Sequence, residues 1–405
     1  MLPSVSSPVK SLRTKSCGNC VRADYDGSLY GGRLMKITFL KAGGFSFAGG
    51  DRVIAIYAER LQKRGHEVCV IARPNAQPSL RQKLQSLLQG KPWFSETEKE
   101  ASHFDNIDVS HRSIDRCRPI VDADVPDADV VIATWWETAE WVASLSEAKG
   151  AKVYFIQHHE VFDYLPQERA KATYSLPLYK ITIANWLVDL MQNQYGDPNV
   201  SLVPNSVDTK LFYAPPRSKQ PIPTVGMLYA SALWKGCDIS LKAFSLAQKK
   251  IPNLHLVAFG SGNLWSELPL PPGSEYGCQL PQNALKDFYA KCDAWLFSSR
   301  VEGFGLPILE AMACRTPVIG TPAGAAPELL SDGAGILVKP EDPEDVARAI
   351  EQICSLSDAE WRVMSDAAYA KATSYTWDDA TDLFEAALHK AIDRWKHRDI
   401  LNYAG

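Results

Sequence analysis

The sequence predicts an α/β protein with two doubly wound, Rossmann-like domains that face each other across a cleft. Its 405 residues exceed twice the usual domain length of ~150 residues. Short apolar segments alternate with segments of helical periodicity along both halves of the chain. Between the halves, residues 215–223 contain four prolines, which favour an extended connector. Ligands of such folds bind beyond the carboxyl ends of the strands, so we expect the functional site in the cleft.

The composition is that of an ordinary globular protein, with 46% apolar and 22% charged residues. This excludes a mostly disordered, a collagen-like or a small disulfide-stapled chain. A net charge of -4 gives no overall positive field, so we expect no nucleic-acid partner. The nine cysteines stand mostly in apolar or helical stretches, which indicates free thiols in a reducing cytoplasm. Cys17 and Cys20 have the spacing of half a zinc site, but no second pair follows nearby.

No segment reaches the ~18 consecutive apolar residues of a membrane-spanning helix, and no secretory pattern precedes Arg33. We therefore expect a cytoplasmic protein, at most peripheral on the inner face of the membrane. The basic stretch at residues 389–398 is compatible with a weak contact to anionic lipid. Alternatively, it is the solvated face of a helix that packs on the first domain.

The first domain is expected over residues 35–205, after a flexible leader at residues 1–34. A glycine-rich loop at residues 41–50 leads into a helix at Asp51–Arg64, whose apolar residues share one face. Residues 75–125 give a weaker pattern, with a helix at Ser79–Gln89 and a loop at Ser95–His111. The strands expected in this domain are Lys36–Leu40, Glu67–Ile71, Asp129–Ala133, Lys152–Ile156, Lys180–Ala184 and Val200–Val203.

The second domain is expected over residues 206–380. Residues 381–405 are expected to form a helix that returns to the first domain. The same alternation of apolar runs and helical periodicity identifies the strands of the second domain. They are Thr224–Leu228, His255–Phe259, Ala294–Ser298 and Pro317–Gly320.

The most informative segment runs from Arg300 to Ala313 and reads RVEGFGLPILEAMA. It follows a predicted strand, turns on two glycines and enters an apolar helix, so backbone N–H groups of the turn and the first helical turn meet at one point. Such a point binds anions. Glu302 lies in the loop and Glu310 about one turn into the helix. Carboxylates accept hydrogen bonds from vicinal hydroxyls, so one glutamate can bind a ribose and the other a sugar ring.

This segment, extended to EGFGLPILEAMACRTPVIGT, resembles the signature of glycosyltransferase family 4, the retaining nucleotide-sugar transferases of GT-B fold. Other segments between Met35 and about Ile392 are similar to family motifs in the same order. They are Gly49-Gly50 with Arg52, RGHEV at residues 64–68, VPNSVD at residues 203–208, LWKG at residues 233–236 and YTW at residues 375–377. The resemblance implies the GT-B fold and a glycosyltransferase, without identifying the sugar.

The resemblance also implies roles for residues of the cleft, with the acceptor on the first domain and the donor on the second. Glu310 would bind the ribose hydroxyls, and Lys235 would neutralise the diphosphate. The donor sugar and phosphate would be held by Glu302 and by the backbone of Gly303, Phe304, Gly305 and Leu306. Gly49 and Gly50 would let the opening loop approach the phosphate or the acceptor, and Asn205 and Ser231 are further donor-site candidates. No cofactor and no metal are expected, because cations and helix N-termini can stabilise the leaving diphosphate.

Besides Ser206, which replaces a glycine of the family, two departures from the family pattern concern the expected cation and the expected histidine. Ala230 stands where the family has an arginine, five residues before Lys235, and Arg300 is the candidate replacement. The family's histidine after the strand Asp129–Ala133 is absent, because Thr134, Trp135 and Trp136 follow this strand instead. We expect His158, after the next strand, to be catalytic together with Glu302 and Lys235. Candidates for the acceptor side are Thr134, His159 and Trp136, the last by stacking on a sugar ring.

These features predict a glycosyltransferase of the hexosyl- or deoxyhexosyltransferase class, active in polysaccharide biosynthesis. It would move a sugar from a nucleoside diphosphate sugar, with dTDP- and UDP-sugars favoured, to a hydroxyl of a glycan, a lipid-linked glycan or a small molecule. The anomeric configuration would be retained. One alternative is a catalytically inactive scaffold that binds nucleotide sugars, suggested by Ala230 and the missing histidine. The other is an NAD-dependent oxidoreductase, which is disfavoured because no G-x-G-x-x-G motif occurs and because Glu302 would lie beside a pyrophosphate.

Overall fold

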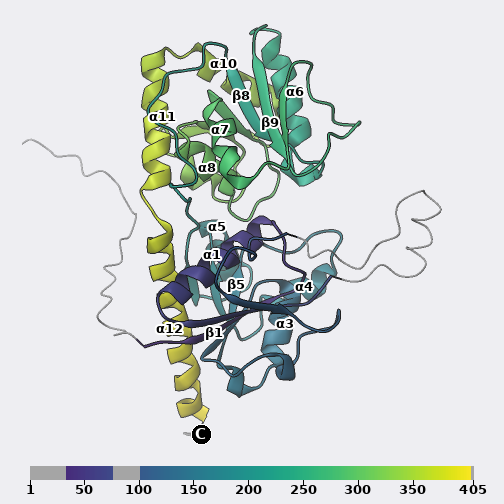
Figure 1. Ribbon diagram of the computed structural model, residues 1–405, viewed down its shortest axis with the longest axis vertical. Coiled ribbons are helices and arrows are strands. Elements are labelled where there is room, and N and C mark those ends of the chain that lie inside the picture. Colours follow the sequence, from purple (N-terminus) through teal and green to yellow (C-terminus); the bar gives the residue numbers. More distant parts are fainter. Residues whose placement is uncertain (1–32, 76–100, 403–405) are drawn as a thin grey trace, which may run out of the picture. The chain divides into compact units, whose positions relative to one another are not determined.

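The computed structural model describes residues 33–75 and 101–402 (Figure 1). It contains two parallel sheets with helices packed against them, which confirms the predicted fold class. In each sheet the order of the strands reverses once along the chain, as in doubly wound folds. Most of the expected leader, Cys17, Cys20 and the helix at Ser79–Gln89 lie outside the described residues.

The first sheet has seven parallel strands in the order β3-β2-β1-β4-β5-β6-β7. The chain builds β1, β2 and β3 outward on one side and then adds β4 on the other side of β1. The loops that follow β1 and β4 therefore diverge and open a crevice at the carboxyl edge of the sheet. The strands are β1 (Lys36–Lys41), β2 (Glu67–Ala72), β3 (Ser110–Ser113), β4 (Val130–Ala133), β5 (Ala151–Ile156), β6 (Tyr179–Thr182) and β7 (Val200–Leu202), and the helices between them are α1 (Gly49–Lys63), α3 (Trp136–Ser144), α4 (Gln167–Thr173) and α5 (Asn185–Asn193).

The second sheet has six parallel strands in the order β10-β9-β8-β11-β12-β13. Here the winding reverses between β8 and β11, so the loops after these two strands open the corresponding crevice. The strands are β8 (Thr224–Leu228), β9 (His255–Gly260), β10 (Glu275–Cys278), β11 (Ala294–Phe297), β12 (Val318–Gly320) and β13 (Gly335–Leu337). The helices are α6 (Cys237–Gln248), α7 (Leu285–Ala290), α8 (Leu306–Ala313), α9 (Ala326–Leu329), α10 (Pro343–Ser355) and α11 (Asp358–Thr373).

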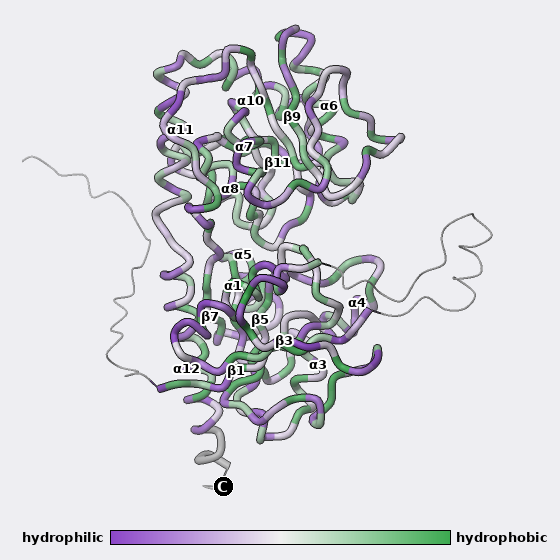
Figure 2. Tube along the Cα trace, viewed as in Figure 1, coloured by the Kyte–Doolittle hydropathy of each residue, from purple (hydrophilic) through white to green (hydrophobic). Residues whose placement is uncertain are grey.

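Three strands were not predicted from the sequence, namely β3, β10 and β13. All three are short strands at the edges of the sheets. The prediction of a loop at Ser95–His111 is wrong for its last two residues, because β3 begins at Ser110. This strand has the sequence SHRS, and none of its four residues is buried. By contrast, β4 and β11 are buried at every position and consist of apolar residues, VVIA and AWLF. Figure 2 colours the chain by hydropathy and labels β11.

The last helix, α12 (Trp377–Asn402), packs against α1 and the strands β4, β5 and β6 of the first sheet. Its Phe384 is buried and stacks on Tyr57 of α1 with ring centroids 4.2 Å apart. The same ring meets Phe155 of β5 at 5.1 Å and Phe39 of β1 at 6.2 Å. The helix begins at Trp377, four residues before the expected boundary at 381. The domain boundaries proposed from the sequence stay predictions.

No helix within the two described ranges is long and apolar enough to cross a membrane. The seven cysteines in these ranges are all free thiols, as expected. In the same ranges, no group of three or more His, Cys, Asp or Glu side chains is placed to hold a metal ion. The cellular location stays a prediction.

Candidate functional site

A cleft of about 800 Å³ lies at the carboxyl ends of strands from both sheets. Its walls are the loops that follow β1, β4 and β5 of the first sheet, and β8 and β11 of the second, together with the first turns of α1 and α8. Both reversals of strand order therefore open into one cavity, which is where folds of this kind bind ligands.

The loop between β11 and α8 carries Glu302 and contacts the first sheet, and Glu310 follows in α8. Gly305 has a φ of +101°, a left-handed conformation that favours glycine. The carbonyl of Gly303 accepts a hydrogen bond of 2.8 Å from Trp186 Nε1 of α5. A Cβ on Gly303 would lie 1.9 Å from the backbone carbonyl oxygen of Gln157. The absence of a side chain at Gly303 thus allows this loop to lie directly against the end of β5.

Lys235 and Glu302 form an ion pair on the second-sheet side of the cleft. Lys235 ends a short 3-10 helix at Leu233–Lys235, and its Nζ lies 2.6 Å from Glu302 Oε1. Ser299 Oγ donates to the same carboxylate oxygen at 2.9 Å. Both charged side chains are partly exposed, at 26% and 13%, and both line the cleft. The cation expected at the diphosphate is therefore present and is held by the glutamate expected at the donor sugar.

Arg52 and Glu310 form a second ion pair, which joins the two sheets. Arg52 lies in the first turn of α1, and its Nη1 is 2.5 Å from Glu310 Oε1 on α8. Tyr289 Oη donates to the other carboxylate oxygen, Oε2, at 2.7 Å. The side chains of Arg52 and Glu310 are 13% and 7% exposed. Both oxygens of Glu310 therefore have partners in the protein.

The glycine-rich loop before α1 is held by charges at its base. Lys41, the last residue of β1, pairs with Asp51 at 3.1 Å and donates to the carbonyls of two loop glycines. Gly49 and Gly50 begin α1 and line the cleft. A Cβ on Gly49 would meet no atom within 4 Å, and one on Gly50 would lie 3.6 Å from the Gln157 amide. The space next to the start of α1 is therefore open.

His158 lies in the cleft at the end of β5, next to the signature loop. Its Nδ1 is 2.9 Å from the carbonyl oxygen of His159, and its Cδ2 would be 3.4 Å from a Cβ on Gly303. Burial lowers the pKa of His158, which favours the neutral imidazole. Because Nδ1 faces a carbonyl oxygen, it carries the proton of the neutral ring, so Nε2 is a hydrogen-bond acceptor.

Glu160 is a buried carboxyl group at the edge of the same cleft. Its Oε2 accepts a hydrogen bond from the backbone N–H of Trp136 at 2.6 Å and one from Tyr154 Oη at 3.0 Å. Burial raises the pKa of Glu160 to about 8, so the group is mostly protonated at neutral pH.

Two expected donor-site residues lie away from the cleft. Arg300 is not among its lining residues, because its guanidinium group pairs with Asp238 at 2.8 Å and with Glu341 at 2.6 Å. Ser231 is exposed in the loop after β8 and does not line the cleft either. The expectation that Arg300 replaces the cation missing at Ala230 is therefore not supported by its position. Asn205, in contrast, lines the cleft and its buried Oδ1 accepts no hydrogen bond from the described residues.

Two expected acceptor-side residues also lie elsewhere. Trp136 was expected to stack on a sugar, but it begins α3 and is only 4% exposed, with Arg169 over its ring. Trp135 lines the cleft instead. The Nε2 of His159 lies 2.8 Å from Tyr195 Oη, outside the lining of the cleft. Thr134 lines the cleft as expected, although its hydroxyl donates to the Leu40 carbonyl at 2.8 Å.

The sequence interpretation assigned no role to four further cleft residues: Arg52, Arg73, Glu137 and Glu160. Arg73 and Glu137 form a bidentate ion pair at 2.9 and 2.8 Å on the first-sheet side. Arg52 could have been found from its place two residues after Gly50, and Glu160 from its place after two histidines at a strand end. Nothing in the sequence pairs Arg73 with Glu137, which are far apart in the chain.

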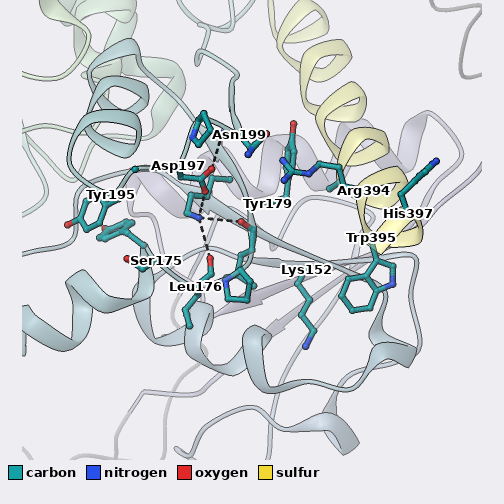
Figure 3. Close-up of a pocket in the computed structure, with 17 residues that line it drawn as sticks. Lys152, Ser175, Leu176, Tyr179, Tyr195, Asp197, Asn199, Arg394, Trp395 and His397 are labelled. Atoms are coloured by element: carbon teal, nitrogen blue, oxygen red, sulfur yellow. Dashed lines mark hydrogen bonds and ion pairs between the residues drawn. The ribbon is translucent and has the colours of Figure 1, made fainter. Parts of the chain in front are cut away.

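A second hollow, of about 730 Å³, lies beside the end of α12 and shares no lining residue with the cleft (Figure 3). Its walls are aromatic and basic side chains such as Tyr179, Arg394 and Trp395. Lys180 in its wall is buried and donates to Asp197 Oδ2 at 2.5 Å. The guanidinium group of Arg394 lies over the Tyr179 ring, 5.6 Å from its centroid.

A comparison with known protein families gives a match within the second half of the chain. Residues 216–371 match the family described as glycosyl transferases group 1. The group 1 segment contains Lys235, Glu302 and Glu310, whereas Arg52, Trp135 and His158 lie outside it. The family resemblance predicted from the sequence is confirmed at the level of group 1.

Curated relatives match only parts of the chain. The O-antigen chain mannosyltransferase B of Escherichia coli is 37% identical over 103 residues, which are 25% of this chain and 26% of that protein. One component of the phosphatidylinositol N-acetylglucosaminyltransferase of Arabidopsis thaliana is 27% identical over 175 residues, or 41% of this chain and 39% of that protein. The matches therefore span between 26% and 39% of the length of these relatives.

Solved structures of similar fold cover most of the chain. Anabaena HepE, in complex with UDP and glucose, has a TM-score of 0.67 at 19% identity and covers 88% of this chain and 100% of its own. Sucrose-phosphate synthase from Thermosynechococcus elongatus has a TM-score of 0.63 at 16% identity, with 89% and 99% covered. The glycosyltransferase WaaG has a TM-score of 0.56 at 16% identity, with 87% and 98% covered. The fold of this chain is therefore GT-B, as predicted.

Proposed function

We propose that the protein is a retaining, metal-independent glycosyltransferase that moves a sugar from a nucleoside diphosphate sugar to an acceptor hydroxyl. The observation that carries this proposal is the pairing of both signature glutamates with cations in one cleft, Glu302 with Lys235 and Glu310 with Arg52. A nucleoside diphosphate sugar offers hydroxyls to the carboxylates and phosphates to the cations. The finer assignment to glycosyltransferase family 4 is part of this proposal.

The donor lies on the second-sheet side in this proposal. The ribose hydroxyls donate to Glu310, and the diphosphate meets Lys235 and the backbone N–H groups at the start of α8. The buried, unpartnered Oδ1 of Asn205 is available for a hydroxyl of the donor. Two structures of Anabaena HepE hold UDP with glucose or UDP-glucose, which favours a uridine nucleotide as the donor here.

The acceptor approaches from the first-sheet side, past Trp135 and His158. In the proposed step, the bond between the anomeric carbon and the diphosphate oxygen breaks, and its electron pair remains on the phosphate. The acceptor oxygen forms its bond on the same face, and its proton passes to the departing phosphate oxygen. Lys235 stabilises the negative charge that develops on that oxygen, and His158 orients the sugar by accepting a hydrogen bond from a sugar hydroxyl at Nε2.

The proposal is tested with purified protein and a set of UDP-, GDP-, ADP- and dTDP-sugars. A nucleotide at about 100 times its dissociation constant should stabilise the fold by ~2.7 kcal/mol, which a thermal shift detects. The Glu310→Ala variant should lose this shift. Transfer in the presence of EDTA, with the same anomeric configuration in donor and product by NMR, would support the full proposal. An inverted product would contradict retention, and no shift with any nucleotide would overturn the donor class.

A catalytically inactive scaffold is the second candidate, because Ala230 leaves the loop after β8 without its expected cation and Arg300 is engaged elsewhere. Such a scaffold would bind the donor and lose binding in Glu310→Ala as the enzyme does. Only an enzyme would release free nucleoside diphosphate from the donor over time. Measuring this release separates the two candidates.

We also propose that the acceptor is a glycan or a lipid-linked glycan. The mannosyltransferase of Escherichia coli and the transferase of Arabidopsis thaliana act, by their names, on an O-antigen chain and on phosphatidylinositol. A weak peripheral contact with the membrane would use the exposed residues Lys390, Arg394 and Lys396 at the end of α12. Binding to anionic vesicles that is unchanged in a variant with all three replaced by alanine would exclude this contact.

A further inference from the structure

Arg52 is placed to do more than join the two sheets. Four lysine and arginine side chains line the described part of the cleft: Lys41, Arg52, Arg73 and Lys235. Lys41 is engaged by Asp51 and by loop carbonyls, and Arg73 by Glu137. Of these four, only Arg52 and Lys235 are paired with the two glutamates, Glu310 and Glu302, to which the donor is expected to bind. A donor that binds to those glutamates would therefore leave these two cations without their carboxylate partners.

We propose that Arg52 is a binding residue for the donor diphosphate, released from Glu310 when the ribose takes that carboxylate. The inference rests on the proposed function and names a further residue of the same site. In this proposal, Arg52 on α1 supplies the positive charge that the family's arginine would supply at the position of Ala230, after β8.

The contacts of Glu310 make an exchange of partners necessary. Its Oε2 accepts from the buried Tyr289 at 2.7 Å, and its Oε1 is 2.5 Å from Arg52. A ribose hydroxyl that donates to Oε1 competes with the guanidinium group for this atom. If Arg52 simply lost its partner in a largely buried site, an unpaired charge would remain, which is costly.

A diphosphate removes this cost because it offers Arg52 a new anionic partner. The planar guanidinium group can donate two parallel hydrogen bonds to phosphate oxygens. The Phe212 ring lies 5.3 Å from the guanidinium carbon and is fully buried, so it provides a rigid surface over which the group can turn. Lys235 undergoes the matching exchange, from Glu302 to the diphosphate, when Glu302 accepts from the donor sugar.

The exchange also gives the donor a contact with each half of the cleft. Arg52 belongs to the helix that begins at Gly49 and Gly50, where the space for a ligand is open. Arg300, the other arginine near the signature loop, is held by Asp238 and Glu341. The binding of the diphosphate by Arg52 would therefore hold α1 and α8 together through the ligand instead of through the direct ion pair.

Isothermal titration calorimetry of the full chain tests this assignment with three ligands of one base: the nucleoside, its monophosphate and its diphosphate. The base is the one that the thermal-shift experiment selects. In Arg52→Ala, the dissociation constant of the diphosphate should rise tenfold or more. The nucleoside should bind as well as or better than to the wild type, because Glu310 no longer has to release Arg52. Equal changes for nucleoside and diphosphate, or an unchanged diphosphate affinity, would overturn the proposal.

Two further variants keep the test decisive. Arg52→Lys retains the positive charge but cannot donate two parallel hydrogen bonds to phosphate oxygens. It should therefore weaken diphosphate binding less than Arg52→Ala does. Arg60→Ala, on the same helix, removes an ion pair with Asp378 outside the cleft and should leave all three affinities unchanged. If Arg52→Ala does not fold, Arg52→Lys decides: diphosphate affinity equal to that of the wild type would overturn the proposal. If the wild type binds none of UDP, GDP, ADP and dTDP, the proposed function itself is overturned. If the wild type binds one of them and Arg52→Ala binds it equally well, only this inference is overturned.

Discussion

The carboxyl group of Glu160 accepts a hydrogen bond of 2.6 Å from the backbone N–H of Trp136. Glu160 follows β5 and Trp136 begins α3 after β4, so this bond joins two neighbouring loops of the cleft. Tyr154 donates to the same carboxyl oxygen, and the backbone N–H of Glu160 donates to Tyr174 Oη at 2.7 Å. The bond keeps Trp135 and His158 on adjacent parts of the cleft wall.

Replacement of Glu160 should change how stability depends on pH. Burial raises the pKa of this carboxyl group from 4.5 to about 8, so between these values the unfolded chain releases a proton that the folded protein retains. The contribution of Glu160 to stability therefore falls as the pH rises from about 4.5 to about 8. In Glu160→Gln this dependence is lost. The free energy of unfolding of the variant, relative to the wild type, should rise by up to about 1.4 kcal/mol per pH unit in this window.

Urea unfolding at several pH values measures this difference. Glu168→Gln is the control, because the side chain of Glu168 is 87% exposed and its replacement should give a difference that does not vary with pH. A constant difference between Glu160→Gln and the wild type across the window would contradict a protonated Glu160.

The two adjacent tryptophans should respond differently to replacement by alanine. Trp135 lines the cleft, so Trp135→Ala should raise the KM for the acceptor while leaving the fold intact, because a flat apolar surface for a sugar ring is lost. Trp136 is 4% exposed, so Trp136→Ala should lower the free energy of unfolding by about 3–5 kcal/mol. Steady-state kinetics and urea unfolding of both variants measure the contrast. A normal KM in Trp135→Ala would remove the acceptor assignment.

Addition of one methyl group at Gly303 should separate the two halves of the cleft. A Cβ there would lie 1.9 Å from the carbonyl oxygen of Gln157, so the signature loop has to move away from β5. A displacement of about 1 Å near reacting groups can cost about 100-fold in rate, and we expect Gly303→Ala to lower kcat/KM by about that factor. Gly262→Ala is the matched control, because a Cβ at Gly262 would meet no atom within 4 Å. Equal activity of the two variants would show that this close contact does not position the site.

The sequence predicted the central strands and the signature loop well, for a physical reason. Strands such as β4 and β11 are buried on both faces and are therefore continuously apolar, while the turn at Gly305 requires a residue that tolerates positive φ. The edge strand β3 carries no such pattern, because Ser-His-Arg-Ser buries almost nothing. Its pairing with β2 comes from backbone hydrogen bonds, which any sequence can form.

Side-chain directions at the site could not be predicted in the same way. Arg300 follows β11 directly and was expected in the cleft, but Asp238 on α6 and Glu341 draw it away. Trp136 was expected to face a sugar, but α3 begins at this residue and the side chain is buried. Trp135, which directly precedes the helix, lines the cleft instead. Both outcomes depend on neighbours that lie far away in the sequence or on the residue at which a helix begins.

The aromatic cluster around Phe384 should account for much of the attachment of α12 to the first sheet. Its ring is fully buried and contacts Tyr57, Phe155 and Phe39 from three different elements. Phe384→Ala removes these contacts and leaves a cavity, which should lower the free energy of unfolding by about 3–5 kcal/mol. Val363→Ala on α11 is the control, because Val363 is 72% exposed and its loss should change stability by less than about 0.5 kcal/mol. Urea titration followed by circular dichroism measures both. If Phe384→Ala is as stable as Val363→Ala, α12 is held mainly by ion pairs with the end of α1 and the residue that follows it, such as those of Arg64 with Asp382 and Glu385.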